Sequence, residues 1–214
     1  MHRIYLHPLP VRIWHWINAA AFVLLILTGL QLRYVGLINA VPFRIAVATH
    51  NLVGFVLIAD FFLWLGFYLS SDRIKVYHPE LDLMKYFRGS VAQALYYGYG
   101  IFKRAPEPFH VSVYSKFNPL QAMTYQLIML LLLPIQIFTG VLLWDLERFA
   151  RVVALFGGVR VIDTVHVLIF IFFVFYLPAH IYLATLGRRP MTHITEMITG
   201  YEEDEEAEGA DAAE

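Results

Sequence analysis

The stretch that decides the fold runs from residue 160 to residue 186 and reads RVIDTVHVLIFIFFVFYLPAHIYLATL. It is long enough to cross the apolar core of a bilayer, which needs about 20 helical residues. His166 and His180 lie within it, fourteen residues apart. Fourteen helical steps of about 100° end about 40° short of four full turns, so both imidazoles share one face, about 21 Å apart along the axis. Two ligand side chains near opposite ends of one membrane helix indicate two stacked cofactors.

The composition identifies the solvent in which this chain folds. Of its 214 residues, 59% are hydrophobic and 15% are charged, and the apolar residues form long blocks. A soluble domain of this length carries far more charge, so the chain is an integral membrane protein. It contains no cysteine, which excludes disulfides, thiolate-bound iron–sulfur clusters and haem attached through a Cys-x-x-Cys-His motif. Any redox cofactor must be held by other side chains.

Four stretches are apolar and long enough to span a bilayer as helices. They cover residues 12–32, 43–69, 119–144 and 160–186. Pro42 and Pro119 lie where first-turn prolines belong, and Asn118 is placed to cap the third helix. Gly187 and Pro190 are placed to end the fourth helix. The sequence therefore predicts one domain with four transmembrane helices, residues 1–201.

Basic residues are distributed unequally between the two sides of these helices. The side that holds both termini and the central loop carries eleven lysines and arginines, and the other side carries five. Because cytoplasmic loops are enriched in these residues, we expect both termini and the loop 70–118 on the cytoplasmic side of a bacterial inner membrane. Within this loop, residues 81–102 are rich in aromatic side chains. They predict either a connector that follows the membrane surface or an interfacial helix.

This orientation places each intramembrane histidine at a depth. His15 lies early in the first helix and His180 late in the fourth, so both are near the cytoplasmic side. His50 lies early in the second helix, which enters from the opposite face, and His166 lies early in the fourth. The outer pair is then His50 with His166, and the inner pair is His15 with His180. One imidazole from each of two helices at one depth is what bis-histidine ligation of haem iron requires.

The predicted fold class is therefore all-α, an integral membrane four-helix bundle with two stacked b-type haems. Ionisable side chains inside a membrane are costly and functional by default, which favours ligation over simple packing for these four histidines. The other five histidines lie in termini and loops, where we expect solvent-exposed or interfacial side chains. They are His2, His7, His78, His110 and His193.

Small residues accompany the histidines. Gly29 follows His15 by fourteen residues and lies on the same helix face at the level of the outer pair, whereas Gly54 lies one turn after His50. A missing side chain at these positions allows a porphyrin to approach the backbone. The pair Thr28-Gly29 is echoed by Thr139-Gly140 in the third helix. Tight helix packing through small residues explains the same glycines equally well.

Several motifs together resemble a known family. They are residues 7–19 (HPLPVRIWHWINA), Thr28-Gly29, His50-Asn51, residues 116–121 (KFNPLQ), His166, residues 180–182 (HIY) and residues 197–201 (MITGY). The chain resembles the bacterial di-haem cytochrome b subunits of respiratory complexes. These include the gamma subunit of membrane-bound formate dehydrogenase and the cytochromes b of nickel–iron hydrogenase and thiosulfate reductase. The resemblance covers nearly all of residues 7–201.

The resemblance implies a function for the whole chain. It implies two haems b with the ligand pairs His50 with His166 and His15 with His180. It also implies a quinone, menaquinone or ubiquinone, near the inner haem, and partner subunits on the outer face such as an iron–sulfur protein, dehydrogenase, hydrogenase or reductase. Asn118 and Gln121 match polar positions of the family's quinone site, although helix capping accounts for the same residue types.

Two acidic features remain. Asp60 lies about 15 Å inward of His50 along its helix, where it serves either a proton route to the quinone or a structural hydrogen bond. Residues 202–214 carry eight acids and no base, whereas residues 1–201 carry nine acids and sixteen bases. We expect this acidic tail to be disordered. For residues 1–201 we expect contact with membrane lipid and with the quinone pool. We expect no nucleic-acid partner.

Two alternative functions use the same residues differently. A membrane metalloenzyme or metal transporter would bind zinc or iron through the histidines, but such sites gather acids and histidines at one depth. A purely structural anchor for an outer-face complex would leave four intramembrane histidines without a role. The sequence favours an electron-transfer subunit that reacts with quinone over both.

Overall fold

The computed structural model describes residues 3–5, 7–71, 82–106, 108–109, 117–186 and 191–203. They form two compact units. Unit 1 comprises residues 1–64 and 170–214, and unit 2 comprises residues 65–169. The last long helix of the chain contributes its first part to unit 2 and its second part to unit 1.

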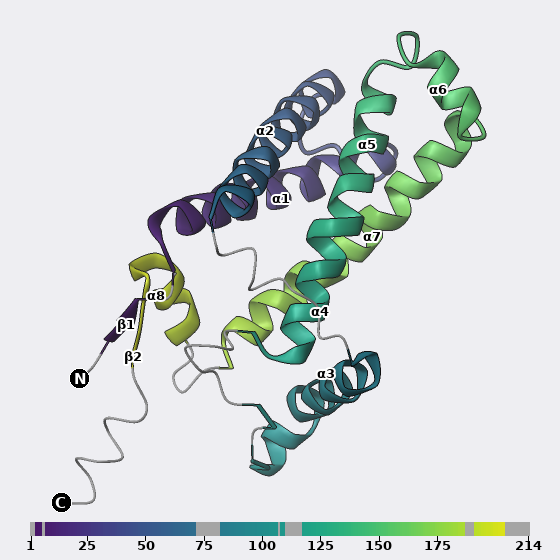
Figure 1. Ribbon diagram of the computed structural model, residues 1–214. Helices are drawn as coiled ribbons and strands as arrows, with labels where there is room; N and C mark the ends of the chain where they lie inside the picture. The colour runs from purple at the N-terminus through teal and green to yellow at the C-terminus, as the bar shows by residue number, and fades with distance from the viewer. Residues whose placement is uncertain are drawn as a thin grey trace, which may run out of the picture. The chain divides into compact units, whose positions relative to one another are not determined.

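Among the described residues, four helices are long and apolar enough to cross a membrane; Figure 1 shows their arrangement along the chain. They are α1 (Leu9–Arg33), α2 (Phe43–Ser70), the continuous helix Pro119–Trp144, and α7 (Val159–Ala184). Their ends lie within three residues of the predicted ones. The predicted class, an all-α membrane helical bundle, is confirmed. Gly187 and Pro190, which were expected to end the fourth helix, lie outside the described residues.

Most apolar side chains of these helices face outward. Only 11% to 28% of the most apolar stretch of each helix is buried within the protein. In water such exposure would be unfavourable, but the acyl chains of a bilayer solvate it, and a helix satisfies its own backbone hydrogen bonds there. The few polar side chains that are buried within the protein therefore indicate where specific contacts between helices occur.

The third membrane helix is not uniform. It consists of α4 (Pro119–Leu127), the π-helical segment η3 (Ile128–Leu132) and α5 (Leu133–Trp144). Pro134 lies two residues after the end of the π segment. Proline has no N–H to donate and its ring clashes with the carbonyl four residues earlier, so the preceding turn widens. The irregular turn thus has a cause in the sequence.

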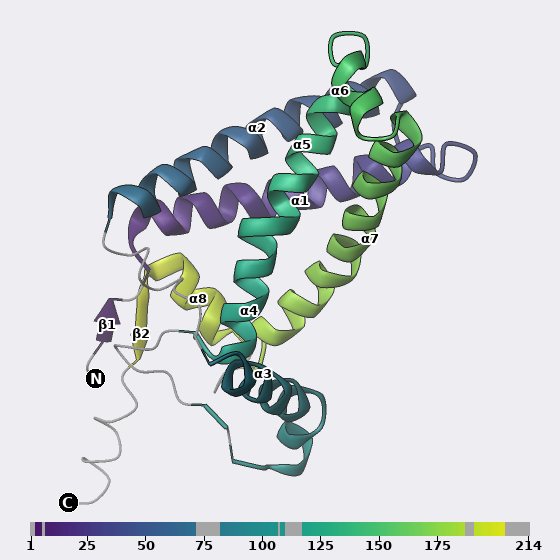
Figure 2. The ribbon, with the colours of Figure 1, turned by 45° about the vertical axis from the view of Figure 1, so that its right-hand side comes forward.

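A small assembly near the chain ends belongs to unit 1. Strand β1 (Arg3–Tyr5) pairs antiparallel with β2 (Tyr201–Glu203), which follows helix α8 (Thr192–Thr199), as Figures 1 and 2 show. Gly200 ends α8 at φ 89°, a conformation that favours glycine. The strand includes two residues of the predicted acidic tail, Glu202 and Glu203, and residues 204–214 lie outside the described part.

Hydrogen bonds tie α8 to α1. The Arg12 guanidinium donates to the carbonyl of Ile198, and Trp16 Nε1 donates to the carbonyl of Met197 at 3.3 Å. These are carbonyls at the end of α8, which have no partner within the helix. The first turns of α1 therefore complete the hydrogen bonding of the chain's last helix.

Unit 2 contains the remaining short elements. They are α3 (Leu83–Gly98), the 3-10 helix η2 (Gly100–Lys103) and α6 (Ala150–Leu155). Helix α6 lies between α5 and α7 along the chain (Figure 1), and Leu142, Val153 and Ile162 form a buried cluster from these three helices. Gly157 and Gly158, at φ 90° and 91°, make the turn into α7. α3 lies in the stretch for which the sequence offered an interfacial helix as one alternative; this stretch is helical, and its place at the membrane surface stays a prediction.

Candidate haem-binding site

His50 of α2 is held by α1, within unit 1. Its Nδ1 lies 2.9 Å from Thr28 Oγ1, and that hydroxyl also donates to the carbonyl of Leu24 at 2.7 Å. The next residue, Gly29, packs against the ring, because a Cβ built there would lie 3.6 Å from His50 Cε1 and 3.3 Å from Phe170 Cε2. Thr28 and Gly29 together fix one edge of the imidazole.

His166 of α7 is held in the same way by α5, within unit 2. Its Nδ1 lies 2.9 Å from Thr139 Oγ1, which donates to the carbonyl of Ile135 at 2.8 Å. A Cβ at Gly140 would lie 3.3 Å from His166 Cε1. The other ring nitrogen, Nε2, lies 3.2 Å from Gln136 Nε2. The side chain of Thr139 is buried, with 3% of its surface exposed.

The inner pair is arranged differently. The rings of His15 on α1 and His180 on α7 lie close together within unit 1, with centroids 6.2 Å apart and an interplanar angle of 57°. Tyr176 stacks on His180 at 5.6 Å, one turn earlier on α7. The structure therefore brings together the two histidines that the sequence assigned to the inner level. His50 and His166 belong to different units, so their pairing stays a prediction.

The residues present fit a haem b iron. The separation of the His15 and His180 rings leaves room for one metal ion with metal–nitrogen bonds of about 2 Å. All four candidate ligands are histidine imidazoles on apolar helices, as a bis-histidine haem requires. A Cβ at Gly140 would crowd His166 Cε1 at 3.3 Å, and one at Gly29 would lie in ordinary contact with His50 Cε1 at 3.6 Å. Within the described residues, no three His, Asp or Glu side chains are grouped to hold a metal ion on their own.

Asp60 of α2 is buried at 3% exposure and accepts a hydrogen bond from Asn18 Nδ2 of α1. Asn18 lies one turn after His15 on the same helix. The second carboxyl oxygen, Oδ1, has no hydrogen-bond partner in the described part of the chain. A buried carboxyl with one oxygen unsatisfied is costly, and such groups are rare in membrane interiors unless they have a function.

Asn118 and Gln121 form a reciprocal cap at the start of α4. Asn118 Oδ1 accepts from Gln121 N at 2.8 Å, and Gln121 Oε1 accepts from Asn118 N at 3.1 Å. The buried Asn118 also donates from Nδ2 to Tyr97 Oη of α3 at 3.1 Å. The capping role weighed in the sequence is therefore present, and the exposed side chain of Gln121 retains an amide nitrogen as donor.

α3 packs on α4 through a polar face. Tyr86 Oη donates to Gln126 Oε1 at 3.1 Å, and burial raises the pKa of Tyr86, so this phenol stays protonated. Ser90 and Gln93 are buried on the same face, at 2% and 0% exposure. A Cβ at Gly89 would lie 2.9 Å from Pro119, which shows how closely the two helices approach.

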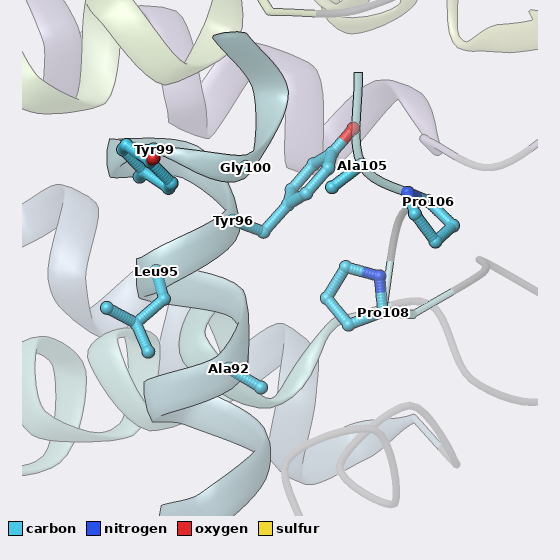
Figure 3. Close-up of a pocket in the computed structure, with 8 residues that line it drawn as sticks. All are labelled: Ala92, Leu95, Tyr96, Tyr99, Gly100, Ala105, Pro106 and Pro108. Carbon is cyan, nitrogen blue, oxygen red and sulfur yellow. The ribbon is translucent and has the colours of Figure 1, made fainter. Parts of the chain in front are cut away.

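The opposite face of α3 is apolar and exposed. Phe87 and Leu95 are 62% and 65% exposed. At its C-terminal end lies a shallow apolar pocket of about 260 Å³, lined by residues that include Leu95, Tyr96, Tyr99 and Pro108 (Figure 3). α3 is thus inverted relative to a surface helix of a soluble protein, since its polar side is inside.

Gly54 and the five histidines outside the membrane helices complete the list of predicted positions. A Cβ at Gly54 would meet no described atom within 4 Å, so its haem contact stays a prediction. His193 is 50% exposed and lies 3.0 Å from Glu196. His7 donates its backbone N–H to the carbonyl of Gly200 at 3.1 Å. His2, His78 and His110 lie outside the described residues.

Sequence reasoning missed the partners of the histidines. Thr28 and Thr139 were noticed only as neighbours of small residues, and Gln136 was not singled out. The one available signal was the repeated Thr-Gly pair, which occurs once in each of two membrane helices. A repeat of that kind points to a shared role before any contact is known.

These observations define a class of protein: a membrane protein whose apolar helices present histidines to a prosthetic group. The family model described as prokaryotic cytochrome b561 matches residues 6–200, and the chain belongs to this family. It is thus a bacterial membrane protein that binds haem b and transfers electrons.

One curated relative is similar over most of its length. The Escherichia coli (strain K12) protein named "Putative cytochrome YdhU" is 36% identical over 204 residues, which cover 93% of this chain and 74% of that protein. No solved structure shows a significant match. The description of the family and the name of this relative both refer to a cytochrome.

Proposed function

We propose that this protein binds two haems b in the bacterial inner membrane and connects a quinone on the cytoplasmic side with an oxidoreductase on the outer face. The observation that carries the proposal is the division of the four histidines into two kinds. The rings of His15 and His180 lie close together, with centroids 6.2 Å apart, whereas His50 and His166 are each held by a threonine of a neighbouring helix. This local division matches the two depths derived from the sequence.

Each residue has a task in this proposal. His15 and His180 bind the inner haem iron, and His50 and His166 bind the outer one. A haem held by two histidines would supply a one-electron carrier whose iron is not open to oxygen or substrate. The apolar side chains around the histidines exclude water and thereby influence the redox potentials.

The quinone site is proposed at the start of α4. A quinone needs an apolar slot for its ring and a few donors for its carbonyls. The exposed Gln121 offers an amide nitrogen, whereas Asn118 already donates to Tyr97 Oη and holds the cap. We therefore assign the direct contact to Gln121 and a supporting role to Asn118. The substrate is menaquinone or ubiquinone.

Asp60 is proposed as a proton carrier to this quinone. Its Oδ1 has no partner within the described residues, and its Oδ2 is held by Asn18. Such a carboxyl can take up and release a proton without breaking the hydrogen bond to Asn18. Both termini are proposed to be cytoplasmic, and an iron–sulfur protein, dehydrogenase, hydrogenase or reductase is proposed to bind on the outer face.

α3 is proposed to lie in the membrane interface, with its apolar face toward the acyl chains. The exposed Lys85 and Arg88 flank this face and suit the headgroups. Because the chain has no cysteine, Phe87→Cys can be labelled uniquely with an environment-sensitive fluorophore and tested with spin-labelled lipids in nanodiscs. Strong quenching is expected at residue 87 and none at Thr195→Cys, which is exposed on α8. Equal quenching at both positions contradicts the placement.

Haem content tests the core of the proposal. We expect the purified full chain to contain two haems in a pyridine haemochrome assay, with low-spin bis-histidine spectra. A well-folded preparation with one haem or none contradicts the two-haem proposal. Fusion of alkaline phosphatase to the C-terminus tests the orientation, because this reporter is inactive in the cytoplasm. An active fusion contradicts a cytoplasmic C-terminus.

A further inference from the structure

The threonine–histidine contacts define a role beyond ligation. We propose that Thr28 and Thr139 are positioning residues, which hold His50 and His166 as the tautomer protonated at Nδ1 and so keep Nε2 unprotonated, as an iron ligand must be; at His166, iron would replace the contact of Nε2 with Gln136. The proposal rests on the assignment of these histidines as haem ligands. It adds that both ligands of the outer haem donate the same hydrogen bond, to the threonine of a repeated Thr-Gly element.

The tautomer follows from counting hydrogens at Thr28. A threonine hydroxyl has one hydrogen to donate. In Thr28 this hydrogen is directed to the carbonyl of Leu24, 2.7 Å away and four residues earlier on α1. The contact of 2.9 Å between Oγ1 and His50 Nδ1 must then be donated by the ring. His50 therefore carries its proton on Nδ1, and the lone pair of Nε2 is available.

The same count applies to Thr139 in the other unit. Its hydroxyl donates to the carbonyl of Ile135 at 2.8 Å, so His166 Nδ1 donates to it at 2.9 Å. Gln136 gives an independent check. Its amide Nε2, which can only donate, lies 3.2 Å from His166 Nε2. His166 Nε2 is therefore an acceptor, which agrees with a proton on Nδ1.

The glycine after each threonine completes the element. A Cβ at Gly29 would lie 3.6 Å from His50 Cε1, and one at Gly140 would lie 3.3 Å from His166 Cε1. Cε1 is the ring atom between the two nitrogens. The threonine thus binds Nδ1 while the glycine leaves space beside Cε1, in two separate units of the chain. Two independent occurrences of one arrangement indicate a function rather than incidental packing.

The inner histidines lack this element. Within the described part of the chain, neither His15 nor His180 has a hydrogen bond to a ring nitrogen. The threonines therefore distinguish the two haem sites chemically. A hydrogen bond accepted from Nδ1–H makes the imidazole a stronger donor to the metal and favours the oxidised iron, so it lowers the potential.

The effect is measured on the purified, haem-loaded full chain. The variants are Thr28→Val and Thr139→Val, which keep the shape and remove the acceptor, with Thr28→Ser and Thr139→Ser as conservative replacements. Thr164→Val, an exposed position two residues before His166 on α7, is the matched control. Haem stoichiometry is determined first, and then both midpoint potentials and the electron paramagnetic resonance spectra.

Each valine variant is expected to raise the midpoint potential of one haem and leave the other unchanged. Each serine variant should return it to the wild-type value, and Thr164→Val should have no effect. If a valine variant loses haem, retention is expected to fall about 10-fold and serine should restore it. Wild-type potentials and spectra in both valine variants overturn the inference, as does haem loss that serine does not reverse. A wild-type chain with fewer than two haems instead contradicts the proposed function.

Discussion

The imidazole ring of His15 lies 6.2 Å from that of His180, although the two residues come from the first and the last membrane helix. This distance is close enough for both rings to bind one metal ion. The contact lies within unit 1 and brings α1 and α7 together at one site. The first prediction concerns this pair.

Replacement of either inner histidine should remove one haem. We expect His180→Ala and His15→Ala to reduce the haem content from two per chain to one, because a bis-histidine site needs both axial ligands. The remaining haem should keep its spectrum. Haemochrome assays on the purified variants provide the measurement. His193→Ala, at an exposed position on α8, should keep both haems, and two haems in His180→Ala would refute its assignment as a ligand.

A methyl group at Gly140 should disturb the outer haem. The added Cβ would lie 3.3 Å from His166 Cε1, so the ring must move by a few tenths of an ångström. We expect Gly140→Ala to shift the electron paramagnetic resonance signal of one haem. Gly66→Ala is the matched control, because a Cβ at this α2 position meets no described atom within 4 Å. Unchanged spectra in Gly140→Ala would show that the ring has freedom to move.

Asp60→Asn should slow quinol turnover. The replacement keeps the volume and the hydrogen bond to Asn18, but it cannot release a proton in the physiological range. A positioned proton carrier contributes about 100-fold or more, so we expect turnover to fall by at least about 10-fold and its pH dependence to flatten. Asn18→Ala, which keeps the acid, should retain that pH dependence. Normal turnover with an unchanged pH profile in Asp60→Asn excludes the proton route.

Gln121 can be tested without loss of the helix cap. Gln121→Glu keeps the oxygen that accepts from Asn118 N but loses the amide donor, whereas Gln121→Leu loses both. If the amide contacts the quinone, both variants should raise the KM for quinol by up to about 10-fold, the equivalent of one hydrogen bond. Haem content should not change. An effect in the leucine variant alone indicates a capping role and no quinone contact.

Gly200→Ala should loosen the attachment of α8. Gly200 has φ 89°, and an added Cβ would lie 2.7 Å from the carbonyl oxygen of His7. The left-handed conformation alone costs about 1–2 kcal/mol for a residue with a side chain. We expect a melting temperature lower by about 2 °C or more in detergent. Gly36→Ala, where a Cβ meets no described atom within 4 Å, should melt like the wild type, and equal melting of both variants would contradict the strain.

The limits of sequence reasoning are visible at particular residues. The pair His15 and His180 was predicted from depth alone, because helix period and orientation assign a level to each residue. Gly54, predicted to touch haem from its position one turn after His50, has open space beside it, and its haem contact stays a prediction. For Asn118 and Gln121 the sequence left a quinone contact and a helix cap open, and the structure shows the cap. A residue type in a sequence allows several roles, and its neighbours select among them.

The apolar blocks of the sequence were sufficient to predict the four membrane helices, and they led to the prediction of two levels of histidines. Long apolar blocks have one stable arrangement in a bilayer, and the helical period then orders the side chains of each block. Only the tertiary structure decided which side chains meet. Thr28 reaches His50 across 22 residues of sequence, Thr139 reaches His166 across 27, and Asn18 reaches Asp60 across 42. Such contacts depend on how two helices pack, which the periodicity of either helix alone does not specify.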